Sequence, residues 1–549
     1  MLQMSRGVSM PDTPTQSAVR AYGRSLADFD DAKAGRHLTA AERALLTACA
    51  RGTIAALNDH RPETELIANP APRPTIKDDT TTVRADFIRF LVGGGDEHAP
   101  VQNRGVLLAG AVVIGVLDLR GIDTTSILAL NSCVIEEKIR LDFAATRSLD
   151  FTGSLLSAGM SAEGLKCHGS LWLRNVDVTG ELTLTSADIE GYLLAEGAVL
   201  TASEDAEWAM SADGIHIGAQ FRLYPSRDGA TRPAAITGGI SLAGATIDGD
   251  LVWVGASIVA GPRRMYAMLC QRTTVGGSFT FKGLTAVEGI VDLSAMSVGI
   301  LDDDLGDGSW AKADGSLVLD GFTYARLAGD AVADASQRRT WLGYQQDGTT
   351  KFRPQPWDQL IAVLRASGHP LDATKLAIMK EDEYRRAGKV KGRWRWTAHW
   401  LLGALVRYGY EPERLASWLL GTWLAAGVVF LLLGPLLIDG LLVPAKSTIA
   451  SNCLVDRIVA ADRRPCPAEH DAPAFLPLSY SADLLVPGLH LGDADEWKLN
   501  WHQSGAGAPL RLVGVGFLFV ASWFERIFGG TGFSVLAVVV GGYLLKKRD

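Results

Sequence analysis

The sequence predicts a mainly β protein, in which a β-solenoid is flanked by an N-terminal helical cap, an α-helical hairpin and C-terminal transmembrane helices. Three observations support this fold class. A short glycine-spaced phrase returns across residues 101–329, helical periodicity flanks that region, and two long runs near the C-terminus are apolar. A repeat does not by itself supply any chemistry, so this repeat predicts the architecture and does not predict the function.

The repeated phrase is a glycine followed by apolar residues at alternate positions. Apolar alternation with a period of two indicates a strand, and glycine indicates a turn. Gly169, Gly180 and Gly191 are 11 residues apart, so we expect half-turns of about 11 residues and coils of about 22. The phrase occurs at Gly115–Leu119, Gly169–Leu173, Gly180–Leu184, Gly238–Leu242, Gly249–Trp253, Gly277–Phe281, Gly289–Leu293 and Gly315–Leu319.

The N-terminal segment is predicted to be disordered over residues 1–25, which are polar and lack the apolar stretch of a signal peptide. Residues 26–100 are predicted to form a helical cap. One helix is expected after Thr39, which with Glu42 fits a capping box, and a second over Thr82–Val92. An open solenoid end exposes unpaired strand edges, so we expect these helices to cover the first coil.

Residues 330–410 change to helical periodicity. We expect an amphipathic helix over Pro356–Arg365 and a second over Asp372–Arg386, which together make a helical hairpin. A basic, aromatic juxtamembrane segment follows, whose charge orients the neighbouring span. Its candidates for binding anionic lipid head groups are Arg385, Arg386, Lys389, Lys391, Arg393 and Arg395.

Residues 411–549 are predicted to form a membrane domain. The runs 415–438 and 527–545 are long and apolar enough to cross a bilayer as helices. Basic flanks place the start of the first run and the end of the second run in the cytoplasm. Residues 439–508 then form an extracytoplasmic loop. The apolar stretch 510–526 is broken by glycines, so we interpret it as interfacial or re-entrant; a third span is the alternative.

Charge and cysteine usage narrow the function classes. A net charge of −8 and a pI of about 5.8 argue against a nucleic-acid partner. Cys453 and Cys466 lie in the predicted extracytoplasmic loop, where we expect a disulfide, with two free thiols as the alternative. Four cysteines are predicted to be reduced, buried thiols: Cys49, Cys133, Cys167 and Cys270.

Motifs of enzyme chemistry are missing from the sequence, which contains no nucleotide-binding loop, zinc-protease motif or serine nucleophile motif. We therefore expect no catalytic residue and no cofactor. The densest acidic cluster gives a candidate metal site at Asp302, Asp304 and Asp307, whose carboxylates suit calcium. The full spacing of a calcium loop is missing, and a solvated turn is the alternative.

The segment between the two predicted spans contains a candidate pore loop, formed by Tyr480, Asp483, Pro487, His490, Gly492 and Asp493. Two-span channels carry a pore helix and a filter at this place, and Leu489–Asp493 loosely resembles the end of a potassium filter. The threonine-rich carbonyl ring is missing, however, and Pro487 falls where the pore helix is expected. An ordered loop that docks on the membrane is the alternative.

The order of these parts is similar to that of bacterial β-helix proteins with a pentapeptide-like or bactofilin-like repeat and a C-terminal membrane anchor. Many of them carry the label "membrane-associated oxidoreductase". The resemblance covers nearly the whole chain and departs after residue 510, where a longer glycine-rich stretch replaces the family's single closing span. The family supplies no catalytic motif, so its label finds no redox site here. The matching segments are Leu38–Arg43, Val83–Leu91, Pro354–Leu360, Arg407–Pro412 and Pro477–Pro487.

These features predict a protein of the bacterial inner membrane with its solenoid in the cytoplasm. We expect a membrane-tethered scaffold or sensor, whose solenoid binds a protein partner or self-associates and whose basic segment contacts membrane lipid. One alternative is an oligomeric ion channel with a degenerate pore loop at 480–493. The other is the oxidoreductase of the family label.

Overall fold

The computed structural model describes residues 25–546 except for 31–34, 36, 60, 62–71, 227–230, 264, 306–309, 311–312, 330, 332, 346–351, 437–441, 445–474, 487, 490, 500 and 502–507. Of residues 1–25, which were predicted to be disordered, 1–24 lie outside this range, and Ser25 precedes η2 (Leu26–Asp28). The chain forms two compact units, Met1–Lys380 and Glu381–Asp549, and each has buried apolar residues of its own.

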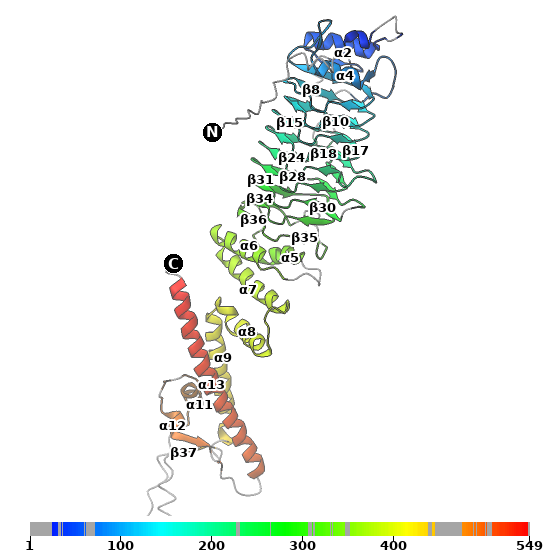
Figure 1. The fold of residues 1–549 in the computed structure, drawn as a ribbon. Coiled ribbons are helices and arrows are strands. Elements are labelled where there is room, and N and C mark those ends of the chain that lie inside the picture. Colours follow the sequence, from blue (N-terminus) through cyan, green and yellow to red (C-terminus); the bar gives the residue numbers. More distant parts are fainter. Residues whose placement is uncertain are drawn as a thin grey trace, which may run out of the picture. The chain divides into compact units, whose positions relative to one another are not determined.

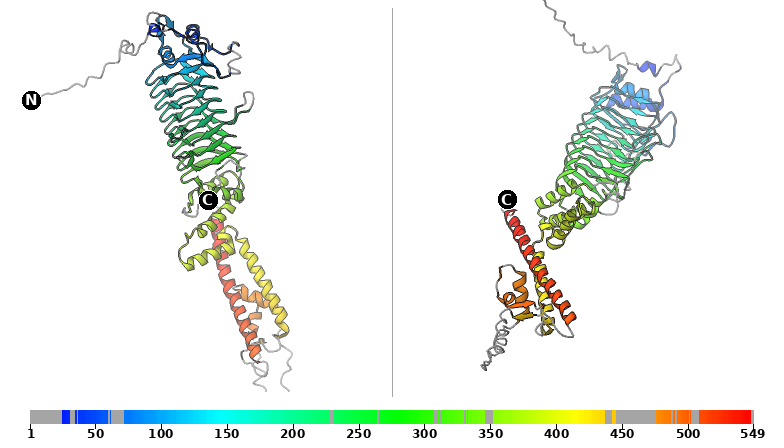
Figure 2. Two further views of the ribbon diagram at one scale, coloured as in Figure 1. Left: turned by 90° about the vertical axis from the view of Figure 1, so that its right-hand side faces the viewer. Right: turned by 60° about the horizontal axis from the view of Figure 1, so that its bottom comes forward.

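Short parallel strands are the main element of the first unit. In its described residues they form one sheet of 16 strands and two sheets of nine, stacked in tiers (Figures 1 and 2). The mainly β architecture expected for residues 101–329 is confirmed as parallel sheets. The large sheet contains β1 (Ala55–Ala56), β5 (Gly105–Ala109), β8 (Ile127–Asn131), β12 (Ser148–Asp150), β16 (Leu171–Trp172), β20 (Leu193–Leu194), β24 (Phe221–Leu223), β28 (Leu251–Val254), β31 (Thr274–Lys282), β34 (Ser297–Asp303) and β36 (Thr323–Leu327), with a second row of β11 (Ala145–Thr146), β15 (Lys166–Cys167), β19 (Asp188–Ile189), β23 (His216–Ile217) and β27 (Thr246–Ile247).

The two smaller sheets follow the same rule of stacking. One contains β2 (Thr82–Arg84), β6 (Val112–Ile114), β9 (Val134–Ile135), β13 (Leu155–Leu156), β17 (Asp177–Thr179), β21 (Val199–Thr201), β25 (Ala235–Thr237), β29 (Ser257–Val259) and β32 (Ala286–Glu288). The other contains β7 (Leu117–Asp118), β10 (Ile139–Arg140), β14 (Met160–Ser161), β18 (Leu182–Thr183), β22 (Met210–Ser211), β26 (Ile240–Ser241), β30 (Tyr266–Leu269), β33 (Ile290–Asp292) and β35 (Leu317–Val318).

Equivalent residues of successive tiers pair in register. Leu149 of β12 pairs with Leu171 of β16, and Leu171 pairs with Leu193 of β20, at a spacing of 22 residues. Stacked apolar side chains make a continuous core, in which a fully buried large side chain contributes about 1.5–3 kcal/mol. This row continues through further buried residues: Phe221, Leu251, Phe279 and Leu301.

Each of the tiers between Ile127 and Ile247 carries four short strands, where the glycine spacing predicted two half-turns. Residues 127–146 contain β8, β9, β10 and β11, each two to five residues long. The chain bends between them, and Ser132 and Phe143 in these bends have a positive φ although neither is glycine. Because such bends contain no glycine, the spacing of glycines in the sequence does not reveal the short distance between successive strands.

Two helices cover the first strands of the stack (Figure 1). α2 (Ala40–Arg51) begins after Thr39, whose Oγ1 accepts from the Glu42 N–H (3.0 Å), while Glu42 accepts from the Thr39 N–H (3.0 Å). The predicted capping box is therefore confirmed. The predicted Thr82–Val92 helix is wrong at its start, because the first three residues pair with β6 as β2, and α4 spans Ala85–Val92. The cap also holds η2 (Leu26–Asp28) and the antiparallel pair β3 (Gly95–Asp96) and β4 (Ala99–Pro100).

An ion pair with a buried carboxylate joins this cap to the stack. Glu42 of α2 is fully buried, and Arg84 at the end of β2 donates to both of its carboxylate oxygens (2.8 and 2.6 Å). Thr39 Oγ1 also donates to the Thr82 carbonyl (2.8 Å). α2 thus satisfies polar groups of the strand that lies at the open edge of its sheet.

Three helices follow the last strand: α5 (Ala335–Gly343), α6 (Gln355–Ala366) and α7 (Pro370–Arg386). The two helices of the predicted hairpin are confirmed as α6 and α7. α6 packs on β36, where the Gln359 side-chain amide donates to the Tyr324 carbonyl (2.7 Å) and that of Gln355 to the Phe322 carbonyl (3.3 Å). These hydrogen bonds satisfy backbone carbonyl groups at the edge of the final strand.

A second buried ion pair closes this end. Asp303, in the middle of the acidic run, is fully buried as the last residue of β34. Arg338 of α5, also fully buried, donates to both carboxylate oxygens (2.8 and 2.6 Å), and the Trp310 indole N–H donates to one of them (3.2 Å). The Arg338 guanidinium lies 5.3 Å from the Trp341 ring centre. The run Asp302–Asp303 is thus strand, not a solvated turn.

We expect Arg338→Met to lower the free energy of unfolding by about 3–5 kcal/mol, because it leaves the buried Asp303 carboxylate without a partner. The measurement is denaturant unfolding of the full chain in an uncharged detergent. Lys282→Met, which removes the partner of the partly exposed Asp302, is the matched control and should cost at most about 1 kcal/mol. Equal losses for the two variants, or no recovery when Asp303→Leu is added to Arg338→Met, would contradict this assignment.

Candidate functional site

The second unit is built on helices. α9 (Glu413–Leu436) and α13 (Ala508–Lys546) are long and apolar enough to cross a membrane, with apolar windows at Glu413–Leu432 and Val513–Val535. α11 (Pro477–Leu485) is short and contacts both of them. The unit also contains α8 (Arg393–Val406), η4 (Arg407–Gly409), α12 (Asp493–Glu496) and the antiparallel pair β37 (Leu442–Pro444) and β38 (Trp497–Leu499).

One continuous helix, α13, occupies the stretch where a re-entrant segment at 510–526 and a separate span at 527–545 were expected. α13 has no break between the two stretches, and its most apolar part, Val513–Val535, crosses the expected boundary. Which part spans a membrane, and the third span as the alternative, stay predictions. Gly514 and Gly516 do not interrupt the helix, because a helical glycine costs only about 1 kcal/mol, and nearby Val515 and Leu518 are buried in the core of this unit.

Apolar side chains of both long helices are exposed. Leu432 of α9 is 72% exposed, and Val513 and Val520 of α13 are 70% and 66% exposed. A contiguous apolar surface of this kind is unfavourable in water and suits lipid or a partner helix.

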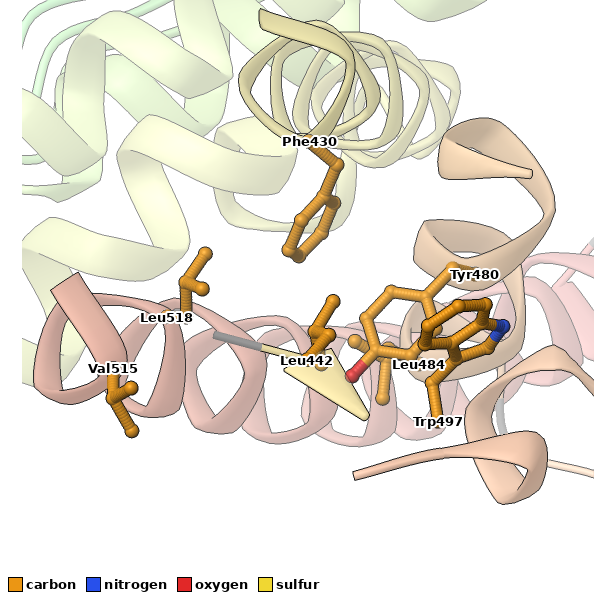
Figure 3. Packing of buried hydrophobic residues seen from close by; sticks show 7 residues of the cluster. All are labelled: Phe430, Leu442, Tyr480, Leu484, Trp497, Val515 and Leu518. Carbon is orange, nitrogen blue, oxygen red and sulfur yellow. The ribbon is translucent and has the colours of Figure 1, made fainter. Parts of the chain in front are cut away.

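A hydrophobic cluster gathers around α11 (Figure 3). Phe430 points from α9 toward Leu442, and its ring centre lies 5.2 Å from that of Tyr480 on α11. The cluster contains buried residues of α9, β37, α11, β38 and α13: Phe430, Leu442, Tyr480, Leu484, Trp497, Val515 and Leu518. α11 therefore packs one face into the unit, while Leu478 at its start stays 47% exposed.

Two glycines make room for α11, one for a side chain and one for its backbone. A Cβ at Gly427 of α9 would lie less than 3.0 Å from the Leu478 side chain, and one at Gly529 of α13 would lie less than 3.0 Å from the Leu485 carbonyl. The Trp423 indole N–H also donates to the Leu478 carbonyl (2.9 Å). Both ends of α11 are thus fixed, one by α9 and the other by α13.

A buried polar pair joins α11 to α13. The Ser481 hydroxyl donates to the Glu525 carboxylate (2.5 Å), and Ser481 and Glu525 are 0% and 1% exposed. The other oxygen of Glu525 has no hydrogen-bond partner among the described residues. An ionisable group in an apolar helix is costly and commonly marks a functional position. The sequence signal was the adjacent pair of charges Glu525 and Arg526 within an apolar run, to which the sequence analysis assigned no site.

The candidate pore loop is organised by Asp483. Its carboxylate accepts from the Leu491 and Ala494 N–H groups (3.0 Å each), so the chain after α11 folds back on the helix. Tyr480 belongs to the hydrophobic cluster, and Gly492, with φ +94°, precedes Asp493 at the start of α12. The structure therefore brings Asp483 close to the 491–494 segment, while Pro487 and His490 lie outside the described residues.

The candidate lipid-binding cations fall into two groups. Arg385 and Arg386 end α7 and pair with Asp382 (3.0 Å) and Glu383 (2.7 Å). Lys389 and Lys391 lie between α7 and α8, whose first turn contains Arg393 and Arg395. α8 also exposes Trp394 (81%), Trp396 and Trp400. An exposed face of arginine and tryptophan suits a membrane interface.

The remaining predicted sites are placed as follows. Asp302 pairs with Lys282 (2.5 Å) and Asp304 accepts from the Gly283 N–H (2.8 Å), whereas Asp307 lies outside the described residues, as do Cys453 and Cys466. No metal-binding group of three or more His, Cys, Asp or Glu side chains occurs among the residues described. The four remaining cysteines are confirmed as buried free thiols, and burial raises the pKa of the Cys133 thiol to about 12.

No family model, curated protein or solved structure matches the chain, and the resemblance to bacterial membrane-anchored β-helix proteins stays a prediction.

Gly529→Ala should destabilise the packing of α11 on α13 by about 1–3 kcal/mol, because the added methyl group meets the Leu485 carbonyl. The matched control is Gly530→Ala, where an added Cβ meets nothing within 4 Å. Thermal unfolding of the full chain in an uncharged detergent measures both. A loss of stability in the control as large as in Gly529→Ala would show that helix effects, not the close approach, determine the result.

Proposed function

We propose that the chain is a membrane-tethered scaffold or sensor, whose parallel sheets close around one core as a β-solenoid. Pairing in register from tier to tier and a helical cap at each end, each with an ion pair whose carboxylate is buried, support this architecture. α9 and α13 are the proposed membrane spans, supported by their length and their exposed apolar side chains.

The observation that carries the scaffold proposal is an exposed aromatic patch on the outward face of the large sheet. Trp172 and Tyr192 are 40% and 42% exposed, and the Arg222 guanidinium lies 5.5 Å from the Tyr192 ring centre. Exposed tryptophan, tyrosine and arginine are the residues most enriched at binding hot spots. The partner is a second copy of the chain or another protein.

The proposed orientation is that of a bacterial inner-membrane protein with the solenoid in the cytoplasm. The cations around Arg393 lie just before α9, and the positive-inside rule assigns that side to the cytoplasm. Residues of the loop 439–508 are then extracytoplasmic.

A photo-crosslinking amino acid at position 172, in the full chain in intact cells, tests the scaffold. We expect a crosslinked adduct heavier than the 58.6 kDa chain, in a membrane fraction that resists alkaline washing. Position 179, an exposed residue of β17 on a different sheet, is the matched control and should yield no adduct. Equal adducts at both positions would contradict the patch, and a chain that washes off the membrane would contradict the tether.

The second candidate is an oligomeric ion channel with residues 480–493 at the pore. It is favoured by α11, a short helix held between two potential spans, which ends at Leu485, before Pro487. We expect ion flux from the full chain in liposomes to be lost in Asp483→Ala, which frees the 491–494 segment, and kept in the exposed control Asp495→Asn. If the unchanged protein conducts no ions, the channel proposal is wrong and the scaffold proposal remains.

A further inference from the structure

A cavity of about 220 Å³ lies in the second unit, immediately before α9. It is bounded by the end of α7, by α8 and by the first turn of α9. Its lining is mainly basic and includes Asp382, Arg385, Trp400, Gly403, Arg407 and Arg414. Three guanidinium groups and one carboxylate give the cavity a net positive charge.

The charges of the cavity are only partly balanced within the protein. Asp382 accepts from Arg385 (3.0 Å) and from the Tyr408 hydroxyl (2.6 Å), so its charge is committed to Arg385. Neither Arg407 nor Arg414 forms an ion pair with any described residue. Two cations therefore face the cavity without a counter-charge.

One of these cations also has an unsatisfied donor. The Nε atom of Arg407 is buried and has no hydrogen-bond acceptor among the described residues. A buried N–H without a partner is unfavourable, and nearly all such groups in folded proteins find an acceptor. An acceptor oxygen that enters the cavity would satisfy it.

The local backbone holds the arginine in place. Arg407, Tyr408 and Gly409 all have a left-handed φ, of 46°, 57° and 88°, in the reversal between α8 and α9. A Cβ at Gly403 would lie 2.6 Å from the Tyr408 hydroxyl oxygen, so glycine is needed beside the tyrosine that binds Asp382. The cavity is thus built by packed, hydrogen-bonded residues.

We propose that this cavity binds the phosphate group of a phosphate ester through Arg407 and Arg414. Guanidinium groups match phosphate oxygens in geometry and charge, and the Arg407 Nε–H supplies a donor that lacks an acceptor. The ester is a lipid head group or a soluble phosphate. The lipid source rests on the proposed membrane function, which places the start of α9 at head-group depth.

This site differs from the basic run expected to contact lipid. Of those candidates it contains only Arg385, and it adds Arg407 and Arg414, which are remote in sequence from the densest run of charge. Arg393 and Arg395 are exposed on α8 and do not line the cavity. They therefore serve as a matched control of equal charge.

Native mass spectrometry of the full chain in an uncharged detergent tests the proposal with three probes. These are short-chain phosphatidylglycerol, glycerol 3-phosphate, and a short-chain diacylglycerol without phosphate. The double variant Arg407→Gln with Arg414→Gln should weaken binding of whichever phosphate-containing probe the unchanged chain binds by at least about tenfold. The control Arg393→Gln with Arg395→Gln should weaken the same binding less than about twofold. If the Gln variant fails to fold, Arg407→Lys with Arg414→Lys, which keeps the charge, should still weaken binding by losing the paired donors.

The outcomes separate the sources. Binding of phosphatidylglycerol alone assigns the site to a lipid, and equal binding of glycerol 3-phosphate assigns it to a soluble ester. Binding of neither, equal weakening by both pairs of Gln variants, or binding of the diacylglycerol would overturn the proposal. A chain that washes off membranes yet binds glycerol 3-phosphate would overturn the membrane function and leave the phosphate site intact.

Discussion

The unpaired edges of a parallel stack are the constraint on which the first unit depends. Each internal strand has hydrogen-bonding partners in the tiers before and after it, but the first and last strands have a partner on one side only. Helices meet this need at both ends, α2 beside β2 and α6 beside β36. An ion pair with a fully buried carboxylate adds to each cap: Arg84 of β2 with Glu42 of α2, and Arg338 of α5 with Asp303 of β34, the strand before β36. Because the carboxylates are buried, loss of either arginine would leave an uncompensated charge and destabilise the fold. The caps therefore define where the stack begins and ends.

The second unit answers a different constraint, which is close packing around a short helix. α11 is nine residues long and could not form a stable helix alone. Glycines on α9 and α13 let both neighbours approach it, and the aromatic cluster around Tyr480 covers its side. The Ser481–Glu525 pair then fixes the rotation of α11 within this apolar setting, since an unpaired carboxylate there would be costly.

The two proposals for the second unit concern different places in it. The proposed phosphate cavity lies at the start of α9 and is lined by Arg414 of its first turn, whereas the folded-back 491–494 segment lies beside Asp483 of α11. An anchor that also recognises a phosphate would fix the depth and rotation of α9 in a membrane.

The sequence by itself determined the elements whose signals are local. Alternation of apolar residues gave the parallel strands, the Thr39–Glu42 spacing gave the capping box, and 3.6-residue periodicity gave α6 and α7. Signals that depend on partners distant in the chain were missed. Asp303 looks like one of several surface acids until Arg338 is placed beside it, and Glu525 looks like a break in a span until Ser481 meets it. Likewise Arg407 lines a cavity only because a left-handed turn reverses the chain. Tertiary structure decided these cases, because the burial and pairing of a charged group depend on which distant residues the fold brings to it.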